Sequence, residues 1–236
     1  MFPLRAIIGA CVALRIHPNV LTLVGVIINF AAAWQFAVGR FVTAGFILLV
    51  ANIFDFIDGK VAEATNLSSR FGGFWDSVMD RFSDLSLFIG VIYLYAQAGR
   101  TDYVMVAAFA MMFSVMTSYT RARAESMIEK CKVGFMERPE RIVLVMIGAF
   151  TNRMAAILWV ILVLSVVTVL DRIYFTWRAL KAQEASAAWL GQSLLTLPLR
   201  AVWHALYWTF DRGTWQYDLM VIAILGFVWL IPPGWI

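Results

Sequence analysis

The chain has 236 residues, of which 62% are hydrophobic and only 14% are charged. A soluble domain of this size is nearer half apolar and a quarter charged, so the composition excludes an ordinary soluble protein and indicates an integral membrane protein. The net charge of +4 comes without a basic arm, and we therefore expect no nucleic-acid partner.

Residues 1–17 carry Arg5 and Arg15 around a short apolar run and lack the long hydrophobic region of a signal peptide. They predict an N-terminal juxtamembrane amphipathic helix lying on the membrane surface. Six apolar stretches follow, with lengths that suit helices satisfying their own backbone hydrogen bonds in lipid. They are residues 20–38, 41–57, 71–98, 103–119, 142–150 and 154–170.

The fifth stretch is short, but Pro139 suits the first turn of a helix and indicates a start before Arg141. The sequence therefore predicts an all-α integral membrane protein built as a six-transmembrane-helix bundle, with residues 1–181 as its membrane domain.

The distribution of positive charge predicts how the bundle is oriented. With the N-terminus in the cytosol, fourteen lysines and arginines up to Lys181 fall on the cytosolic side, and only Arg40, Arg100 and Arg153 fall on the far side. This asymmetry follows the positive-inside rule. We therefore expect a multi-pass protein of the inner (cytoplasmic) membrane, with its N-terminus on the cytosolic side.

Residues 182–236 predict a separate, membrane-associated C-terminal extension. Residues 189–215 are rich in aromatics interspersed with Arg200, His204 and Arg212, which is typical of an interfacial helix pair. Residues 219–231 are apolar and end at Pro232 and Pro233. This last stretch suits either a seventh span or a re-entrant hairpin.

Four aspartates flank the junction of the second and third expected helices. Asp55 and Asp58 are three residues apart, and Asp76 and Asp80 are four apart, so each pair shares a helix face. If the two helices pack antiparallel, the four carboxylates converge in one pocket. Their mutual repulsion in a medium of low dielectric then requires a cation.

Oxygen ligands favour a hard divalent ion, and we predict Mg²⁺ or Mn²⁺. Such an ion at a membrane surface is suited to bind a pyrophosphate, and a remaining carboxylate can accept the proton of an attacking alcohol. Gly59 and Gly72 would let a ligand approach the backbone.

These residues resemble the signature of the CDP-alcohol phosphotransferase family, Asp-x2-Asp-Gly-x2-Ala-Arg-x8-Gly-x3-Asp-x3-Asp. The matching positions are Asp55, Asp58, Gly59, Ala62, Gly72, Asp76 and Asp80. One position departs from the signature, because Glu63 stands where the family has an arginine near the CDP group.

The resemblance implies a role for each matching residue. Asp55, Asp58 and Asp76 would be metal ligands, and Asp80 the general base that also touches metal. Gly59, Ala62 and Gly72 would contact the CDP donor, as would Pro18, Asn19 and Thr22 at the start of the first span, where Pro18 equally suits a plain helix start. Asp84 continues the face of Asp76 and Asp80 and could orient Asp80 from a second layer.

The loop before the fifth span is dense in arginine, which suits bidentate phosphate recognition. Its Ala-Arg-Ala-Glu and Glu-Arg-Pro-Glu-Arg segments resemble the branch of phosphatidylinositol-phosphate and archaetidylinositol-phosphate synthases. That resemblance implies that the acceptor is inositol 1-phosphate, with its phosphate bound by Arg121, Arg123, Arg141 and Arg178. Glycerol 3-phosphate is the alternative acceptor.

The reaction implied by this resemblance takes CDP-diacylglycerol from the membrane lipid, transfers its phosphatidyl group and releases CMP. The family also implies a homodimer. Two other classes remain open on the sequence alone. A transporter would also use buried carboxylates, but its site would lie at the bilayer midplane between repeats. A non-catalytic membrane scaffold is the second alternative, because Glu63 departs from the signature.

Overall fold

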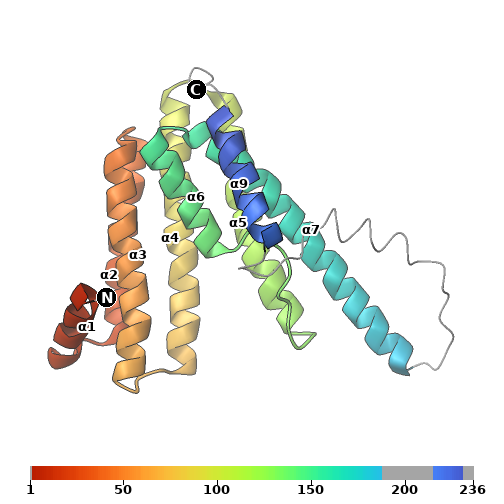
Figure 1. Ribbon diagram of the computed structural model, residues 1–236, viewed down its shortest axis with the longest axis horizontal. Coiled ribbons are helices and arrows are strands. Elements are labelled where there is room, and N and C mark those ends of the chain that lie inside the picture. The colour runs from red at the N-terminus through yellow and green to blue at the C-terminus, as the bar shows by residue number, and fades with distance from the viewer. Residues whose placement is uncertain (1, 188–214, 231–236) are drawn as a thin grey trace. The chain divides into compact units, whose positions relative to one another are not determined.

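The computed structural model describes residues 2–187 and 215–230, and within these ranges the regular structure is helical throughout (Figure 1). The helices are α1 (Phe2–Ala13), α2 (Pro18–Ala37), α3 (Phe41–Ala64), α4 (Arg70–Gln97), α5 (Thr101–Glu125), α6 (Arg138–Thr151), α7 (Met154–Ala187) and α9 (Trp215–Leu230). The all-α prediction is therefore confirmed. The expected interfacial helices of residues 189–215 lie almost wholly outside the described residues.

Four of the described helices are long and apolar enough to cross a membrane. They are α2, α3, α5 and residues Met154–Gln183 of α7. Helix α4 has 28 residues, but acidic side chains occupy its first half, and α6 has only 14 residues. A multi-pass membrane protein is therefore supported, and the count of six spans stays a prediction.

The described residues form two compact units. The first runs to Ala108 and includes Met146–Asn152; the second comprises Phe109–Val145 and the described residues from Arg153 onward. Helices α5 and α6 each contribute to both units. The boundary expected at residue 181 stays a prediction.

In the first unit, α2 packs against both α3 and α4. Its buried residues recur every three or four positions along one broad face, as expected for a helix between two neighbours. Gly90 of α4 lies so close to Ala33 of α2 that an added Cβ would meet the Ala33 carbonyl carbon at 3.0 Å. The absence of a side chain at Gly90 therefore sets how closely α4 approaches α2.

Helix α1 packs against the second half of α3. Cys11 is buried with Ile57 and Val61, and Ile8 and Val12 complete the contact. Ile7 of α1 is exposed, so this helix places hydrophobic surface beside the aspartate-bearing part of α3.

In the second unit, the segment between α5 and α6 is fixed against α7. The backbone N–H of Met136 donates to the hydroxyl of Thr168 at 3.0 Å, and Arg172 donates to the carbonyl of Val133 at 2.9 Å. Gly134 has a φ of +89° and lies against Thr168, so a side chain there would be strained and would clash. Helix α6 then starts at Arg138 with Pro139 in its first turn, as predicted.

We expect Gly90→Ala to lower stability, because the new methyl group would push α4 away from the Ala33 backbone. Overpacking of this kind costs about 1–3 kcal/mol. The measurement is the thermal unfolding midpoint of the purified protein in detergent. Gly9→Ala is the matched control, since an added Cβ at Gly9 has nothing within 4 Å and alanine favours a helix. Equal unfolding midpoints for Gly90→Ala and Gly9→Ala would contradict the role of Gly90 in the close contact between α4 and α2.

Candidate active site

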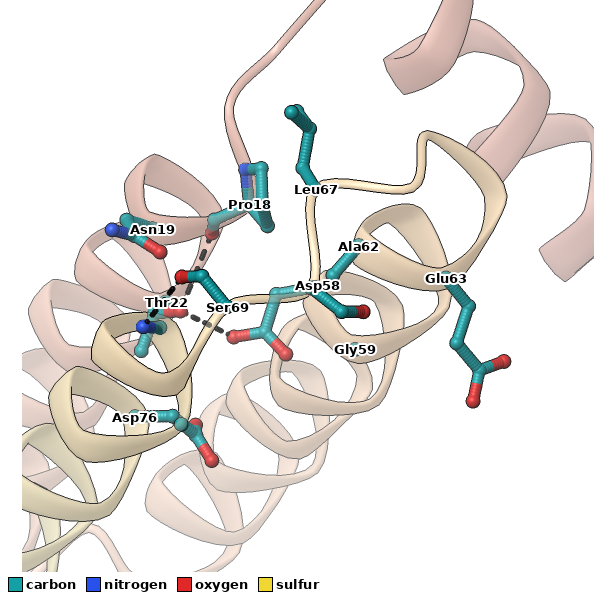
Figure 2. A pocket seen from close by; sticks show the side chains of 13 residues that line it. Pro18, Asn19, Thr22, Asp58, Gly59, Ala62, Glu63, Leu67, Ser69 and Asp76 are labelled. Carbon is teal, nitrogen blue, oxygen red and sulfur yellow. Dashed lines mark hydrogen bonds between the residues drawn. The ribbon is translucent and has the colours of Figure 1, made fainter.

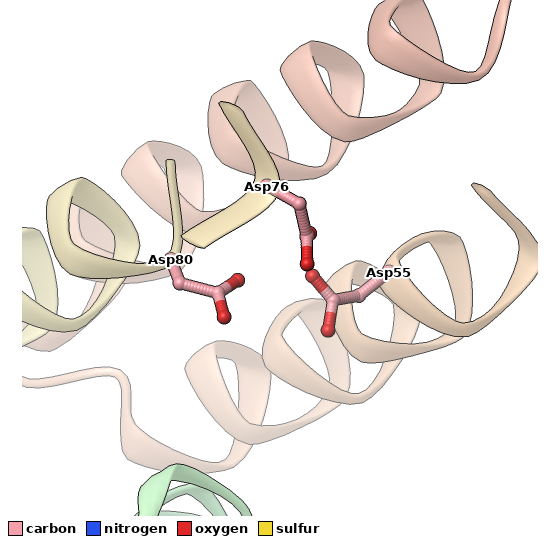
Figure 3. Close-up of side chains that lie close together, drawn as sticks. All are labelled: Asp55, Asp76 and Asp80. Atoms are coloured by element: carbon pink, nitrogen blue, oxygen red, sulfur yellow. The ribbon is translucent and has the colours of Figure 1, made fainter. Parts of the chain in front are cut away.

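Three of the four predicted aspartates meet. One carboxylate oxygen each from Asp55 of α3 and from Asp76 and Asp80 of α4 lie within 4.8 Å of one another. Figure 3 shows the three carboxylates pointing toward a common point from the two helices. The spacing of four residues in α4 brings Asp76 and Asp80 to the same face, and Asp55 reaches that face from α3.

This arrangement fits a divalent cation. At an effective dielectric near 20, two unit charges about 4 Å apart repel by roughly 4 kcal/mol, so three neighbouring carboxylates are costly to keep ionised without positive charge. Arg81 supplies one such charge, since its Nη1 lies 3.9 Å from Asp80 Oδ2, which leaves most of the charge of the three carboxylates to be balanced. Three half-buried carboxylates could hold a hard ion such as Mg²⁺ or Mn²⁺.

The fourth aspartate lies beside this group and is held by α2. Asp58 is buried, and its Oδ2 accepts a hydrogen bond of 2.6 Å from the hydroxyl of Thr22. Thr22 is buried as well, so the Asp58 carboxylate is fixed in position. The structure gives Thr22 the role of orienting Asp58, and its contact with the donor stays a prediction.

A pocket adjoins the aspartates and contains every residue predicted to bind the donor (Figure 2). Its walls come from the starts of α2 and α4, the end of α3 and the intervening loop. The lining residues are Pro18, Asn19, Thr22, Asp58, Gly59, Ala62, Glu63, Leu67, Ser68, Ser69, Gly72, Gly73 and Asp76. Asp58 and Asp76 therefore belong to the pocket that the donor residues form.

Two helix N-termini open into this pocket. Pro18 is the first residue of α2, as expected for a helix start, and the preceding His17 accepts a hydrogen bond from the Asn19 N–H at 3.2 Å. Ser69 caps α4 by accepting from the Gly72 N–H at 2.9 Å. Helix N-termini favour anions through their N–H groups and dipoles, so both ends suit phosphate oxygens.

Ser69 had no assigned role in the sequence analysis. A serine just before the third helix is a typical N-cap, which was a usable signal. A Cβ at Gly72 would lie 3.2 Å from the Ser69 Oγ and 3.7 Å from the Asn19 Oδ1. The missing side chain at Gly72 therefore keeps this corner of the pocket open.

Glu63, which departs from the family signature, is paired rather than isolated. Its carboxylate is 68% exposed and lies 2.8 Å from the ammonium of Lys60, one turn earlier in α3. In Figure 2 it points away from Asp58. The pair offsets the negative charge that Glu63 adds at the rim of the pocket.

The arginines predicted for the acceptor lie in the second unit, where two of the four join a network. Arg121 contacts Glu137 at 2.8 Å and Glu125 at 3.1 Å. Arg141 is buried and donates to the Thr117 hydroxyl at 3.2 Å. Arg123 and Arg178 are both exposed, and Arg123 lies 3.3 Å from the Ser126 hydroxyl.

Arg172 connects the Arg121–Glu137 ion pair to the hydrogen bond between Arg141 and Thr117, and no role was predicted for it from the sequence. It is 2% exposed, lies 3.2 Å from the Glu137 carboxylate and donates to the backbone carbonyl of Thr117. Arg121, Arg172 and Arg141 thus form one chain of contacts through Glu137 and Thr117. The usable signal was a charged residue inside a helix that begins in the membrane, since such residues are costly and commonly functional.

Asp84, the expected supporting residue, is buried in α4 one turn beyond Asp80. It lies on the face that continues from Asp76 and Asp80, as the spacing predicts. Its role in orienting Asp80 stays a prediction.

The chain resembles known proteins over most of its length. Residues 15–229 match the sequence model of the CDP-alcohol phosphatidyltransferase family. Archaetidylinositol phosphate synthase of Pyrococcus horikoshii is 35% identical over 173 residues, which cover 73% of this chain and 89% of that protein. Phosphatidylinositol phosphate synthase of Mycobacteroides abscessus is 31% identical over 166 residues, covering 66% and 76% of the two chains.

Solved structures are similar as well. The crystal structure of Mycobacterium tuberculosis phosphatidylinositol phosphate synthase with CDP-DAG bound has a TM-score of 0.71 and 26% sequence identity, covering 75% of this chain and 94% of that one. The same synthase in complex with manganese and citrate gives a TM-score of 0.69 at 28% identity, covering 73% and 88% of the two chains.

We expect Asp76→Asn to raise the melting temperature of the metal-free protein, because it removes one charge from three crowded carboxylates. A gain of about 1–2 kcal/mol in the free energy of unfolding raises the melting temperature of a chain of this size by roughly 2–8 °C. The same variant should lose most of the stabilisation that Mn²⁺ gives the unsubstituted protein. Asp218→Asn, an exposed position in α9, is the control and should respond to Mn²⁺ normally. If Asp76→Asn melted below the unsubstituted protein without metal, this would contradict the repulsion among the three carboxylates.

Proposed function

The chain belongs to the CDP-alcohol phosphatidyltransferase family, and on that premise we propose that it transfers a phosphatidyl group, or a similar lipid phosphate, from CDP-diacylglycerol to inositol 1-phosphate. The cluster of Asp55, Asp76 and Asp80 beside a pocket with two helix N-termini is the observation that carries the proposal. The relatives named as inositol-phosphate lipid synthases support the choice of acceptor.

Asp55, Asp76 and Asp80 hold Mg²⁺ or Mn²⁺ in this proposal, with Asp58 at the neighbouring position as the fourth ligand. When bound, the ion neutralises the oxygens of the donor diphosphate and of the leaving CMP. The manganese complex of the M. tuberculosis synthase supports the assignment.

The pocket binds the CDP part of the donor. The N-termini of α2 and α4 face the phosphates, and Gly59, Ala62 and Gly72 leave room for the nucleotide because they carry little or no side chain. Asn19 offers a polar side chain at the same corner. The complex of the M. tuberculosis synthase with CDP-DAG supports this assignment.

Asp80 acts as the general base. It accepts the proton of the acceptor hydroxyl, whose oxygen forms the new bond to the lipid-side phosphorus while the bond from that phosphorus to the CMP oxygen breaks. CMP leaves with the electron pair of that bond. Asp84, one turn further along α4, keeps Asp80 oriented.

Arg121 and Arg141 bind the phosphate of the acceptor, and Arg123 and Arg178 add positive charge nearby. We add Arg172 to this set, because it shares Glu137 with Arg121 and Thr117 with Arg141. Guanidinium groups suit this task since each presents a planar fork of donors to phosphate oxygens.

The protein lies in the inner membrane as a bundle of six spans flanked by α1 and the C-terminal segment, with membrane lipid around it and the aspartates on the cytosolic side. The excess of lysine and arginine on that side supports this orientation. We also propose a homodimer, as expected from the family.

The direct test is release of CMP from CDP-diacylglycerol with and without Mg²⁺. We expect metal-dependent release with inositol 1-phosphate and little with free inositol or serine, because only a phosphorylated acceptor would engage the arginines. Preference for glycerol 3-phosphate would replace the acceptor but keep the reaction. Absence of CMP release with every acceptor would overturn the proposal in favour of a transporter or scaffold.

We expect Asp80→Asn to reduce kcat by about a hundredfold or more, since an amide cannot accept the acceptor proton. The dissociation constant for CDP-diacylglycerol should change little, as measured by equilibrium binding. Asp102→Asn, at an exposed position of α5, serves as the control and should keep its rate. Turnover near the unsubstituted rate in Asp80→Asn would exclude the general-base role.

We expect Arg121→Gln to raise the KM for inositol 1-phosphate by about 10- to 100-fold, the effect of losing one charged hydrogen bond. The KM for CDP-diacylglycerol should stay within about twofold. Lys130→Gln removes an exposed positive charge from the same connecting segment and is the matched control. An equal effect of both variants would indicate a general charge effect instead of a phosphate contact.

A further inference from the structure

Helix α9 is apolar on all sides from Leu219 to Leu230. One stripe of partly or fully buried residues recurs every three or four positions: Val221, Ile224, Leu225 and Val228. The opposite stripe is exposed: Leu219, Ile222, Gly226, Trp229 and Leu230. A helix that is hydrophobic all round belongs in a protein core or a membrane, and in a chain this apolar the cover for its outer stripe is lipid.

The inner stripe packs on α7, and the end of α9 is bound by Arg153. The Arg153 Nη1 donates to the backbone carbonyls of Val228 and Trp229, both at 2.7 Å. Its guanidinium also lies 5.5 Å from the centre of the Trp229 ring. The last carbonyls of a helix have no partner within it, and leaving them unpaired in lipid costs several kcal/mol each.

The position of Arg153 gives the direction of α9. Arg153 directly precedes Met154, the first residue of α7, so α9 ends beside the start of α7 and runs antiparallel to it. The 16 residues of α9 rise about 24 Å, most of a hydrocarbon core of about 30 Å. Asp218, its one charged residue, lies in the first turn at the other end.

The end of α6 belongs to the first unit, as the aspartates do, so its position relative to them is defined. Phe150, near the end of α6, lies so close to Gly45 that a Cβ added there would meet its ring at 3.0 Å, and it stacks edge-on with Phe46 near the start of α3. Asp55 lies in the second half of α3, as do Ile57 and Val61, against which α1 packs. The end of α6 and helix α1 therefore lie toward opposite ends of α3.

We propose that α9 crosses the membrane antiparallel to α7 and that Arg153 fastens its last turn. Leu230 then lies on the membrane side opposite to α1 and the aspartates. This distinguishes a further span from a re-entrant hairpin, which would return its end to the starting side. The proposal concerns only the C-terminal segment and does not rest on the transfer reaction.

The test uses the full chain in sealed membrane vesicles of known orientation, with one protease-cleavable tag at the N-terminus and another at the C-terminus. We expect the two tags to be cleaved from opposite faces. Cleavage of both tags from the same face would overturn the proposal, whether or not the protein is active.

The role of Arg153 is tested by hydrogen exchange in detergent. Arg153→Gln should speed exchange across residues 215–230 by about tenfold or more, while exchange in α2 stays unchanged. Arg40→Gln is the matched control, an exposed arginine before α3 whose side chain makes no capping hydrogen bond there. Trp229→Leu keeps both hydrogen bonds and should have a smaller effect. Unchanged exchange in Arg153→Gln would overturn the fastening role.

Discussion

The repulsion among the carboxylates of Asp55, Asp76 and Asp80 is the constraint around which the first unit is built. These oxygens come within 4.8 Å although they belong to two helices. Helix α2 packs on both of those helices and so fixes their relative position. The close contact of Gly90 with Ala33 and the hydrogen bond from Thr22 to Asp58 both belong to this packing. The fold thus supplies the energy that holds like charges together.

The second unit has the opposite arrangement, because it buries positively charged arginine side chains. Arg141 and Arg172 are each 2% exposed, and Thr117 and Glu137 provide oxygen partners for them. Burial without such partners would cost more than the helices could offset. The first unit therefore gathers carboxylates at one site and the second gathers guanidinium groups at another, which matches a reaction that needs a metal and an anionic acceptor.

The sequence predicted the helices and the approach of Asp55, Asp76 and Asp80, and the contacts that it did not predict have physical reasons. Helix ends followed from proline, glycine and the apolar runs. The contact of Asp58 with Thr22 was not predicted, because a step of three residues turns its side chain about 60° from that of Asp55 and brings one oxygen to α2. Arg172 was missed because α7 continues to Ala187, well beyond the apolar stretch that ended at residue 170. The spacing of residues along the sequence indicates neither the contact of Asp58 with Thr22 nor the length of α7.

The pairing of Lys60 with Glu63 ties two positions of α3 together. Restoring arginine at position 63 alone would place two cations one turn apart and leave Lys60 without its partner carboxylate. The two positions are therefore electrostatically coupled, although the pair is exposed and its energy is small, about 1 kcal/mol or less. If a related sequence is judged by its residue at the signature position alone, an acid there suggests lost activity even where a neighbouring lysine compensates for it.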